Sequence, residues 1–246
     1  MPRLLVLHPT TSAGGSALLA THVRAACGDR AIAVDVVTAR LGAPYIACEA
    51  SYAVAGHGAL DAWAAAVRPP AEPPGAVLLG CFGDPGLLAL RQCATVPVVG
   101  LAEAAFLEAA RHGRFAIVTG GIAWDPMLRR LAHALGHGDA LATIEIVAPT
   151  GAELAADPPM AERVLAQACA RAATVDGVRA VIVGGAGLAG LAARLQGGSA
   201  LPLIDSVAAG ARRALALLDP APPRAVSRCG VAWGGVSPEL RRLGDA

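Results

Sequence analysis

Residues 76–87 read AVLLGCFGDPGL and residues 180–191 read AVIVGGAGLAGL. The first stretch leads on to VPVV at 96–99 and the second to LPLI at 201–204. Each copy is therefore an apolar run, a glycine-rich corner, a short helical stretch and a second apolar run with a proline near its start. A duplicated strand–corner–helix–strand unit predicts two similar lobes that face each other across a cleft. The copies differ where Cys81 in the first corresponds to Gly185 in the second.

The rest of the chain alternates short apolar runs with Ala- and Leu-rich stretches of helical spacing, which predicts βαβ units and mostly parallel sheets. The expected strands are 4–8, 31–38, 76–81, 97–100, 114–119, 141–147, 179–184 and 202–205, and the expected helices are 16–27, 46–67, 101–112, 125–136, 160–173 and 206–218. We therefore expect an α/β protein with two pseudo-symmetric Rossmann-like lobes, each a mostly parallel sheet flanked by helices, and with the site in the cleft between them.

The matching halves also suggest where the lobes divide. Residues 1–100 and 206–246 should form the first lobe, and residues 101–205 the second. A proline-containing tail from Asp219 should leave the core and pack on the surface or on a neighbouring subunit.

Composition excludes several classes of partner. Of the 246 residues 55% are hydrophobic and 16% charged, and the net charge is +1 without a basic run, which argues against nucleic acid. No apolar stretch reaches membrane-spanning length without Gly, Pro or a charge, and the N-terminus lacks the apolar region of a signal peptide. Six scattered cysteines are then expected to be reduced thiols in the cytoplasm. The apolar chain and its tail favour a homo-oligomer.

Cys81 is the first candidate for chemistry. It ends a predicted buried strand, and Asp84-Pro85 has the pattern of an N-cap followed by the first residue of a helix. A thiol beside a helix N-terminus has its pKa lowered from about 8.5 toward neutrality, as proton transfer requires. The alternative is a small buried apolar residue, since free cysteine is among the most buried residue types.

Two hydroxyl-rich corners follow strands in matching places of the two halves. Their hydroxyls and amides could bind a carboxylate or a ring amide, although helix capping would use the same residue types. These candidates are Thr10, Thr11, Ser12, Thr119, Gly120 and Gly121. His8, at the end of a strand, could orient a substrate or satisfy the backbone.

The second corner also satisfies another motif. Gly185 to Gly190 fits G-x-G-x-x-G after a strand, and Asp205 lies 20 residues beyond Gly185, as in a dinucleotide-binding site. Asp205 is the best candidate for a carboxylate facing the cleft, and it could equally cap the helix that starts at Ser206. The first copy, with Cys81 and Asp84-Pro85, has no place in a nucleotide site. The histidines show no metal-ligand spacing, so no metal site is expected.

The residues at 81–87 (CFGDPGL), 97–104 (PVVGLAEA) and 115–119 (FAIVT) resemble the Asp/Glu/hydantoin racemase superfamily, nearest its hydantoin and allantoin racemase branch. The resemblance covers roughly residues 3–218. It implies two α/β lobes, a small-molecule substrate, no cofactor and proton transfer at an acidic carbon by two opposed cysteines. Cys81 matches the first cysteine, and Phe82, Gly185 and Ala186 should contact the substrate.

Two departures from the family pattern leave the mechanism open. The second cysteine falls at Gly185, and the usual Asn-Pro-Asn-Thr-Ser is replaced by the HPTTS that starts at His8. Another group or a water could serve the second face of the substrate. A single thiol could suffice, as in the related arylmalonate decarboxylases, whose cysteine resembles the second position. The protein could also bind a small acid, or a dinucleotide, without catalysis.

Overall fold

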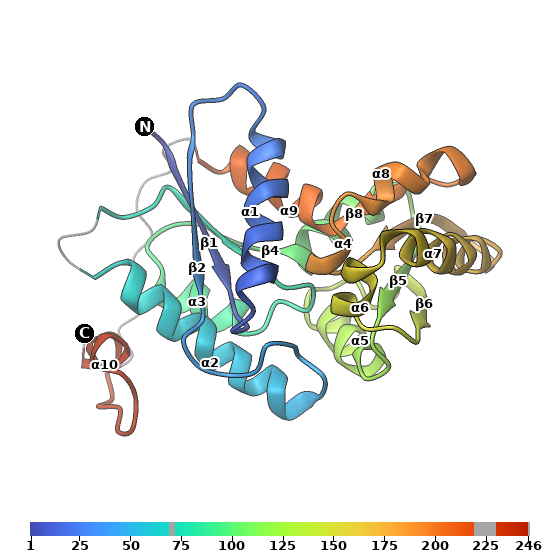
Figure 1. Cartoon of the computed structure of the whole chain (residues 1–246). Helices are drawn as coiled ribbons and strands as arrows, with labels where there is room; N and C mark the ends of the chain where they lie inside the picture. Colours follow the sequence, from blue (N-terminus) through green and yellow to red (C-terminus); the bar gives the residue numbers. More distant parts are fainter. Residues whose placement is uncertain (69–71, 219–229, 246) are drawn as a thin grey trace.

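The computed structural model describes residues 1–68, 72–218 and 230–245. It contains two parallel four-stranded sheets, one in each half of this described chain (Figure 1). The first sheet has the order β2-β1-β3-β4 and the second the order β6-β5-β7-β8. The strands are β1 (Arg3–His8), β2 (Ala33–Thr38), β3 (Ala76–Leu79), β4 (Val98–Gly100), β5 (Arg114–Gly120), β6 (Leu141–Val147), β7 (Val178–Val183) and β8 (Leu203–Asp205). The repeated order confirms the predicted α/β fold with two pseudo-symmetric lobes.

Helices cover both sheets, and several lie where the spacing predicts them. They are α1 (Ala13–Cys27), α2 (Glu49–Ala66), α3 (Leu87–Cys93), α4 (Leu101–Ala110), α5 (Trp124–Ala134), α6 (Gly151–Ala156), α7 (Pro158–Ala173), α8 (Leu191–Leu195), α9 (Ser206–Ala216) and α10 (Pro238–Asp245). The pattern did not predict α6, a short helix whose first turn is closed by a capping box between Thr150 and Glu153.

The central strands are buried on both faces, which is why their sequences are continuously apolar. All four residues of β3 are buried, as are five of the six in β1. In the second sheet β5 and β7 have the same character. The carboxyl ends of these four strands are therefore held firmly by the two cores, and they position the loops that follow.

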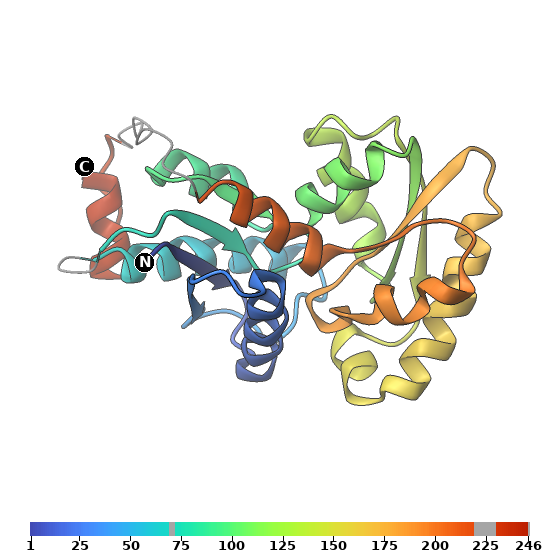
Figure 2. The same ribbon diagram turned by 90° about the horizontal axis from the view of Figure 1, so that it is seen from above.

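The chain exchanges helices between the two sheets. Helix α4 follows β4 of the first sheet but contacts β5 and β7 of the second, whereas α9 follows β8 and returns to contact β3 and β4 (Figure 2). The two helices also contact each other, and Arg212 of α9 pairs with Glu108 of α4. These contacts support the lobe division at residues 100 and 205, which stays a prediction.

The C-terminal helix α10 packs on α2, with Leu240 buried and Glu239 near Arg40 and Arg68. The predicted departure of the chain at Asp219, with Pro220, Pro222 and Pro223, lies outside the described residues. Within the described residues, no helix combines the length and the apolar character needed to cross a membrane.

Candidate active site

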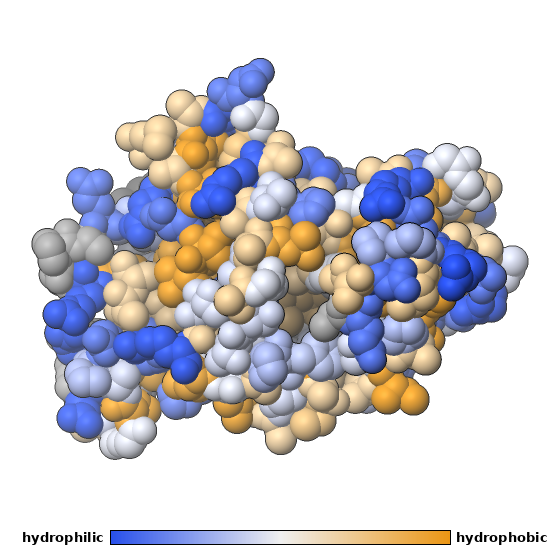
Figure 3. Space-filling view, in the orientation of Figure 1, coloured by the Kyte–Doolittle hydropathy of each residue, from blue (hydrophilic) through white to orange (hydrophobic). Residues whose placement is uncertain are grey.

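A cavity of about 500 Å³ lies between the two sheets, at the carboxyl ends of their central strands. The space-filling view shows the surface hollowed between the lobes (Figure 3). The residues that line it come from both halves of the chain: His8, Thr10, Ser12, Gly14, Gly15, Leu18, Pro44, Tyr45, Ile46, Gly80, Cys81, Phe82, Thr119, Gly120, Trp124, Gly151, Ala155, Ala156, Gly184, Gly185, Ala186, Gly187 and Leu188. Strand ends of this kind are where open α/β sheets bind ligands.

The cavity brings together the predicted site residues except Thr11, Gly121 and Asp205. Cys81 and Phe82 come from the first corner, and Gly185 and Ala186 from the second. The others lie at the end of β1, just after it, or at the end of β5. The backbone N–H of Thr11 donates to the carbonyl of Ala43 instead, so this residue anchors a neighbouring loop.

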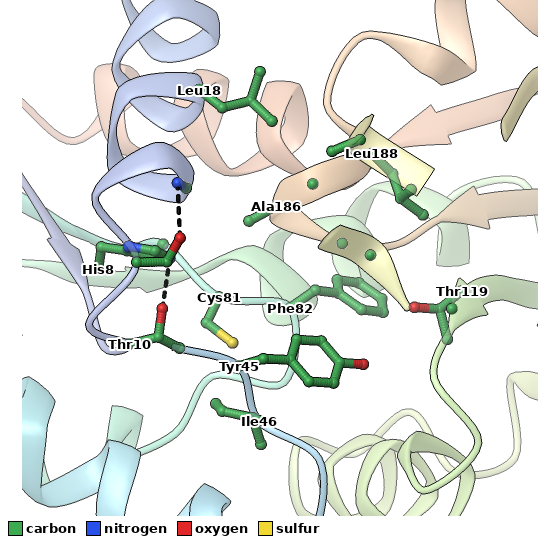
Figure 4. A pocket seen from close by; sticks show the side chains of 18 of the residues that line it. His8, Thr10, Leu18, Tyr45, Ile46, Cys81, Phe82, Thr119, Ala186 and Leu188 are labelled. Atoms are coloured by element: carbon green, nitrogen blue, oxygen red, sulfur yellow. Dashed lines mark hydrogen bonds between the residues drawn. The ribbon is translucent and has the colours of Figure 1, made fainter. Parts of the chain in front are cut away.

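The Cys81 side chain is directed into the cavity, next to the ring of Tyr45 (Figure 4). Burial, and then the nearby carboxylate of Asp84, raise the pKa of the Cys81 thiol. The predicted lowering of this pKa is therefore wrong. The reason is local: α3 begins only at Leu87, with Gly86 as its N-cap, so no helix starts at Asp84-Pro85.

Asp84 has a different structural task. It is buried with a left-handed φ of 51°, and its carboxylate accepts hydrogen bonds from the backbone N–H groups of Ala102 (3.0 Å) and Glu103 (2.8 Å). It therefore caps α4, the helix that crosses to the second lobe. Burial raises the pKa of Asp84 to about 7, and the two hydrogen bonds oppose that shift.

His8 lies in a buried polar cluster beneath the start of α1. Its Nδ1 lies 2.9 Å from the Ser16 hydroxyl, which in turn lies 2.6 Å from the Thr38 hydroxyl, and its Nε2 lies 3.2 Å from the Thr10 hydroxyl. Burial lowers the pKa of His8 to about 4, so the imidazole is neutral near pH 7. The hydroxyl of Ser12 accepts from the N–H of Gly15 and caps α1.

Thr119 contributes a free hydroxyl from the second lobe. The residue is 5% exposed, it lines the cavity, and within the described residues its hydroxyl has no hydrogen-bond partner in the protein (Figure 4). The Gly121 amide, by contrast, donates to the carbonyl of Val147 and is not available. Thr119 can therefore donate to or accept from a bound ligand.

The second corner is shaped by glycine. Gly185 has a φ of +147°, which side-chain-bearing residues rarely adopt, and a Cβ there would lie 3.2 Å from Cγ of Leu188. At Gly184 a Cβ would collide with the ring of Phe82. The Phe82 ring thus reaches from the first corner onto the backbone of the second, and this close approach requires glycine.

Some lining residues were missed by the sequence interpretation. Pro44, Tyr45 and Ile46 belong to the loop between β2 and α2, and Trp124 opens α5. The Trp124 indole N–H donates to the Tyr45 hydroxyl at 3.2 Å, so a first-lobe loop touches the second lobe. These residues sit outside the repeated pattern, so nothing in the duplication indicated them.

Asp205 does not face the cavity, contrary to the prediction. One carboxylate oxygen accepts from the N–H groups of Val207 and Ala208 and caps α9, and the other accepts from the N–H of Gly190. The glycine motif opens on a three-residue 3₁₀ turn rather than on a helix. The acidic residue of the dinucleotide motif is thus already bonded, and the helix N-terminus that would hold a pyrophosphate is missing from this corner.

The described part of the chain contains no cluster of three or more His, Cys, Asp or Glu residues arranged to hold a metal ion.

Comparison with known proteins agrees with this architecture. The Asp/Glu/hydantoin racemase family model matches residues 4–214. A hydantoin racemase from Rhizobium meliloti is 34% identical over 144 residues, which are 58% of this chain and 60% of that protein, so the match spans about three fifths of the relative's length.

Solved structures match this chain over nearly its whole length. An allantoin racemase from Klebsiella pneumoniae is 28% identical with a TM-score of 0.86, and 99% of each chain is covered. A variant of arylmalonate decarboxylase in its liganded form is 17% identical with a TM-score of 0.61, covering 92% of this chain and 97% of that one, and it shares the fold. Since the family model spans both lobes and the corners that form the cavity, the chain belongs to the Asp/Glu/hydantoin racemase family.

Proposed function

We propose that this protein is a cofactor-independent racemase that moves a proton at the carbon next to a carbonyl group, with Cys81 as an acid/base. The observation that carries the proposal is the Cys81 thiol inside a cavity between the two lobes. The likeness to hydantoin and allantoin racemases supports it. The substrate-binding roles of His8, Thr10, Ser12, Phe82, Thr119, Gly120, Gly185 and Ala186 form part of the same proposal.

The lining of the cavity favours an uncharged substrate. Among the described residues that line it there is no Asp, Glu, Lys or Arg, and His8 is neutral. Burying an ionised group without a partner of opposite charge is costly, so a zwitterionic amino acid or a malonate dianion fits poorly. A neutral five-membered ureide ring, such as a 5-substituted hydantoin, can instead use neutral donors and acceptors.

In this proposal the Cys81 thiolate removes the proton from the acidic carbon, and the electron pair moves onto the adjacent carbonyl. The Thr119 hydroxyl, which has no protein partner, can donate a hydrogen bond to the oxygen on which negative charge develops. Since burial raises the pKa of Cys81, the thiol is mainly neutral near pH 7. We therefore expect kcat/KM to rise with pH from neutral into alkaline solution.

The test is proton exchange in heavy water, followed by NMR, with 5-substituted hydantoins, allantoin, amino acids and arylmalonates. The wild type should exchange the acidic proton of a hydantoin and lose its optical rotation, and Cys81→Ala should be slower by about 10³-fold or more. Cys169→Ala is the matched control, because Cys169 is a buried cysteine in the core of the second lobe. Wild-type-like turnover in folded Cys81→Ala would contradict the mechanism.

A single-thiol decarboxylase is the second candidate, because the glycine at position 185 leaves Cys81 without an opposed cysteine, although the cysteine of the arylmalonate decarboxylases resembles the second position. It predicts that deuterium enters the product only as carbon dioxide leaves an arylmalonate. The uncharged cavity argues against such a doubly charged substrate.

We also propose that the protein works in a reducing compartment such as the cytoplasm. Cys27, Cys48, Cys81 and Cys169 are free thiols, and Cys81 must stay reduced to carry a proton. The homo-oligomer stays a prediction.

A further inference from the structure

The second face of the substrate lacks the expected acid/base. Racemisation needs a proton to leave one face of the carbon and another to arrive on the opposite face. Position 185, which corresponds to Cys81 in the repeat, is a glycine with a φ of +147°. If the proposed function holds, another group of this chain or a water must deliver or accept that second proton.

Few side chains at the cavity can exchange a proton. The titratable ones among its described lining residues are His8, Tyr45 and Cys81. Both ring nitrogens of His8 already have hydroxyl partners, and burial lowers its pKa to about 4, so the imidazole has no proton to spare near neutral pH. Tyr45 is the group that is left.

The position of Tyr45 suits it to be the second acid/base. The residue belongs to a first-lobe loop, but its hydroxyl reaches the second lobe, where it touches Gly121 and accepts a hydrogen bond from the Trp124 indole at 3.2 Å. Within the described residues the hydroxyl proton itself has no acceptor. The ring lies beside Cys81, with the hydroxyl on the side of Thr119 (Figure 4).

The electrostatics of the pair are consistent with a shared proton. Burial is the main cause that raises the pKa of Tyr45, and a charge on Cys81 raises it further, so thiolate and phenolate disfavour each other. One of the two groups then holds a proton when the other has lost its own. The Trp124 N–H acts in the opposite direction and stabilises the phenolate.

We propose that Tyr45 is the second catalytic acid/base and acts on the face of the substrate opposite Cys81. In one direction the Cys81 thiolate takes the proton and the C–H bond electrons form the enolate. The Tyr45 O–H bond then breaks, its proton bonds to the other face of the carbon, and the enolate electrons form the new C–H bond. The products are a Cys81 thiol and a Tyr45 phenolate, which together process the opposite enantiomer by the reverse steps.

Tyr45→Phe tests this assignment because it keeps the ring and removes the proton-carrying oxygen. Each enantiomer of a 5-substituted hydantoin is incubated separately with the wild type and the variant in heavy water, and deuterium uptake and optical rotation are followed. We expect racemisation to fall by about 10²-fold or more. Exchange without inversion should persist for the enantiomer whose proton faces Cys81, and should be lost for the other.

Tyr52→Phe is the matched control, since the Tyr52 hydroxyl donates to the carbonyl of Gly83 and does not line the cavity. Any effect of that change should fall on both enantiomers alike. The Tyr45 assignment would be overturned if Tyr45→Phe racemised like the wild type, or if it lost exchange of both enantiomers equally. A wild type that exchanged no substrate would overturn the proposed function and this assignment together.

Discussion

In each lobe one carboxylate joins the glycine-rich corner to the helix that crosses between the lobes. In the first lobe this carboxylate belongs to the corner, and in the second it belongs to the strand end that precedes the helix. In the first corner, Asp84 reaches forward to cap α4 through the N–H groups of Ala102 and Glu103. In the second, Asp205 ends β8, caps its own helix α9 and reaches back to the N–H of Gly190. Each carboxylate ties a corner to the helix that crosses between the lobes.

The comparison explains two further residues. Gly100 ends β4 in the place where Asp205 ends β8, and a Cβ at Gly100 would collide with the Asp84 carboxylate. Leu188 occupies the place in the second corner that Asp84 has in the first. In the first lobe the Asp84 carboxylate therefore leaves no room for a side chain at Gly100. The matching position in the second lobe is Asp205, which supplies the carboxylate there.

Replacing Asp84 with the second corner's residue should have the largest effect. Asp84→Leu leaves two N–H groups of α4 without acceptors and puts a leucine at a φ of 51°. We expect a loss of about 4 kcal/mol in the free energy of unfolding, measured with urea.

The double variant Asp84→Leu with Gly100→Asp sharpens this test. It copies the second corner's arrangement, with the carboxylate at the strand end, and Gly100 has an ordinary φ of −92° that aspartate can adopt. It should recover part of the lost stability. A double variant less stable than Asp84→Leu alone would show that a carboxylate at the strand end cannot replace the Asp84 carboxylate in the first lobe.

His8, in the first lobe, should make the free energy of unfolding depend on pH, by about 3 kcal/mol in total. The pKa of His8 is about 4 in the folded protein against 6.5 for the free side chain, so the unfolded chain binds more protons between these values. The contribution of His8 is present above pH 6.5 and is lost as the pH falls toward 4. Urea unfolding of the wild type and His8→Asn across this range measures it, and parallel profiles would contradict the prediction.

Asp84 should change the free energy of unfolding with pH in the direction opposite to His8. Its pKa is about 7 in the folded protein against 3.8 for the free side chain, so the folded chain binds more protons in that window. The contribution of protonated Asp84 is present below pH 3.8 and is lost as the pH rises through about 7. An Asp84→Asn variant should therefore lose stability on acidification more steeply than the wild type.

Restoring a thiol to the second corner should have a smaller effect. Gly185→Cys puts a side chain at a φ of +147° and against Leu188, which should cost about 2 kcal/mol without raising racemisation. Gly185→Ala is the matched control and should lose the same stability, as differential scanning calorimetry can measure. A gain in racemisation with unchanged stability would show that the backbone at 185 readily adopts an ordinary φ.

The sequence predicted the parts of this molecule that depend on repetition and burial. Eight apolar runs indicated eight strands, and the matching corners indicated a cleft that Cys81, Thr119 and Gly185 line together. It did not predict the partners of Asp84 or the bond from the Gly190 N–H to Asp205, because only tertiary folding brings these N–H groups within reach. The alternative that Asp205 caps the helix starting at Ser206 is confirmed. Tyr45 was missed because its loop has neither periodicity nor a copy in the other half. The predicted direction of the Cys81 pKa shift was wrong because the thiol is buried, and because a motif typical of a helix start folds here into a left-handed turn.

The smallest effect is expected when a dinucleotide is added to the protein and its melting temperature is measured. The glycine motif at 185–190 predicts binding only if its N–H groups and Asp205 are free, and the Gly185 N–H donates to the Ser206 hydroxyl while the Gly190 N–H donates to Asp205. A ligand that binds the folded state raises the melting temperature in proportion to its occupancy. Millimolar NAD should therefore leave the melting temperature unchanged, whereas a 5-substituted hydantoin should raise it. A saturable shift with NAD would mean that the second corner can exchange its internal hydrogen bonds for phosphate, and that the two corners differ in ligand as well as in structure.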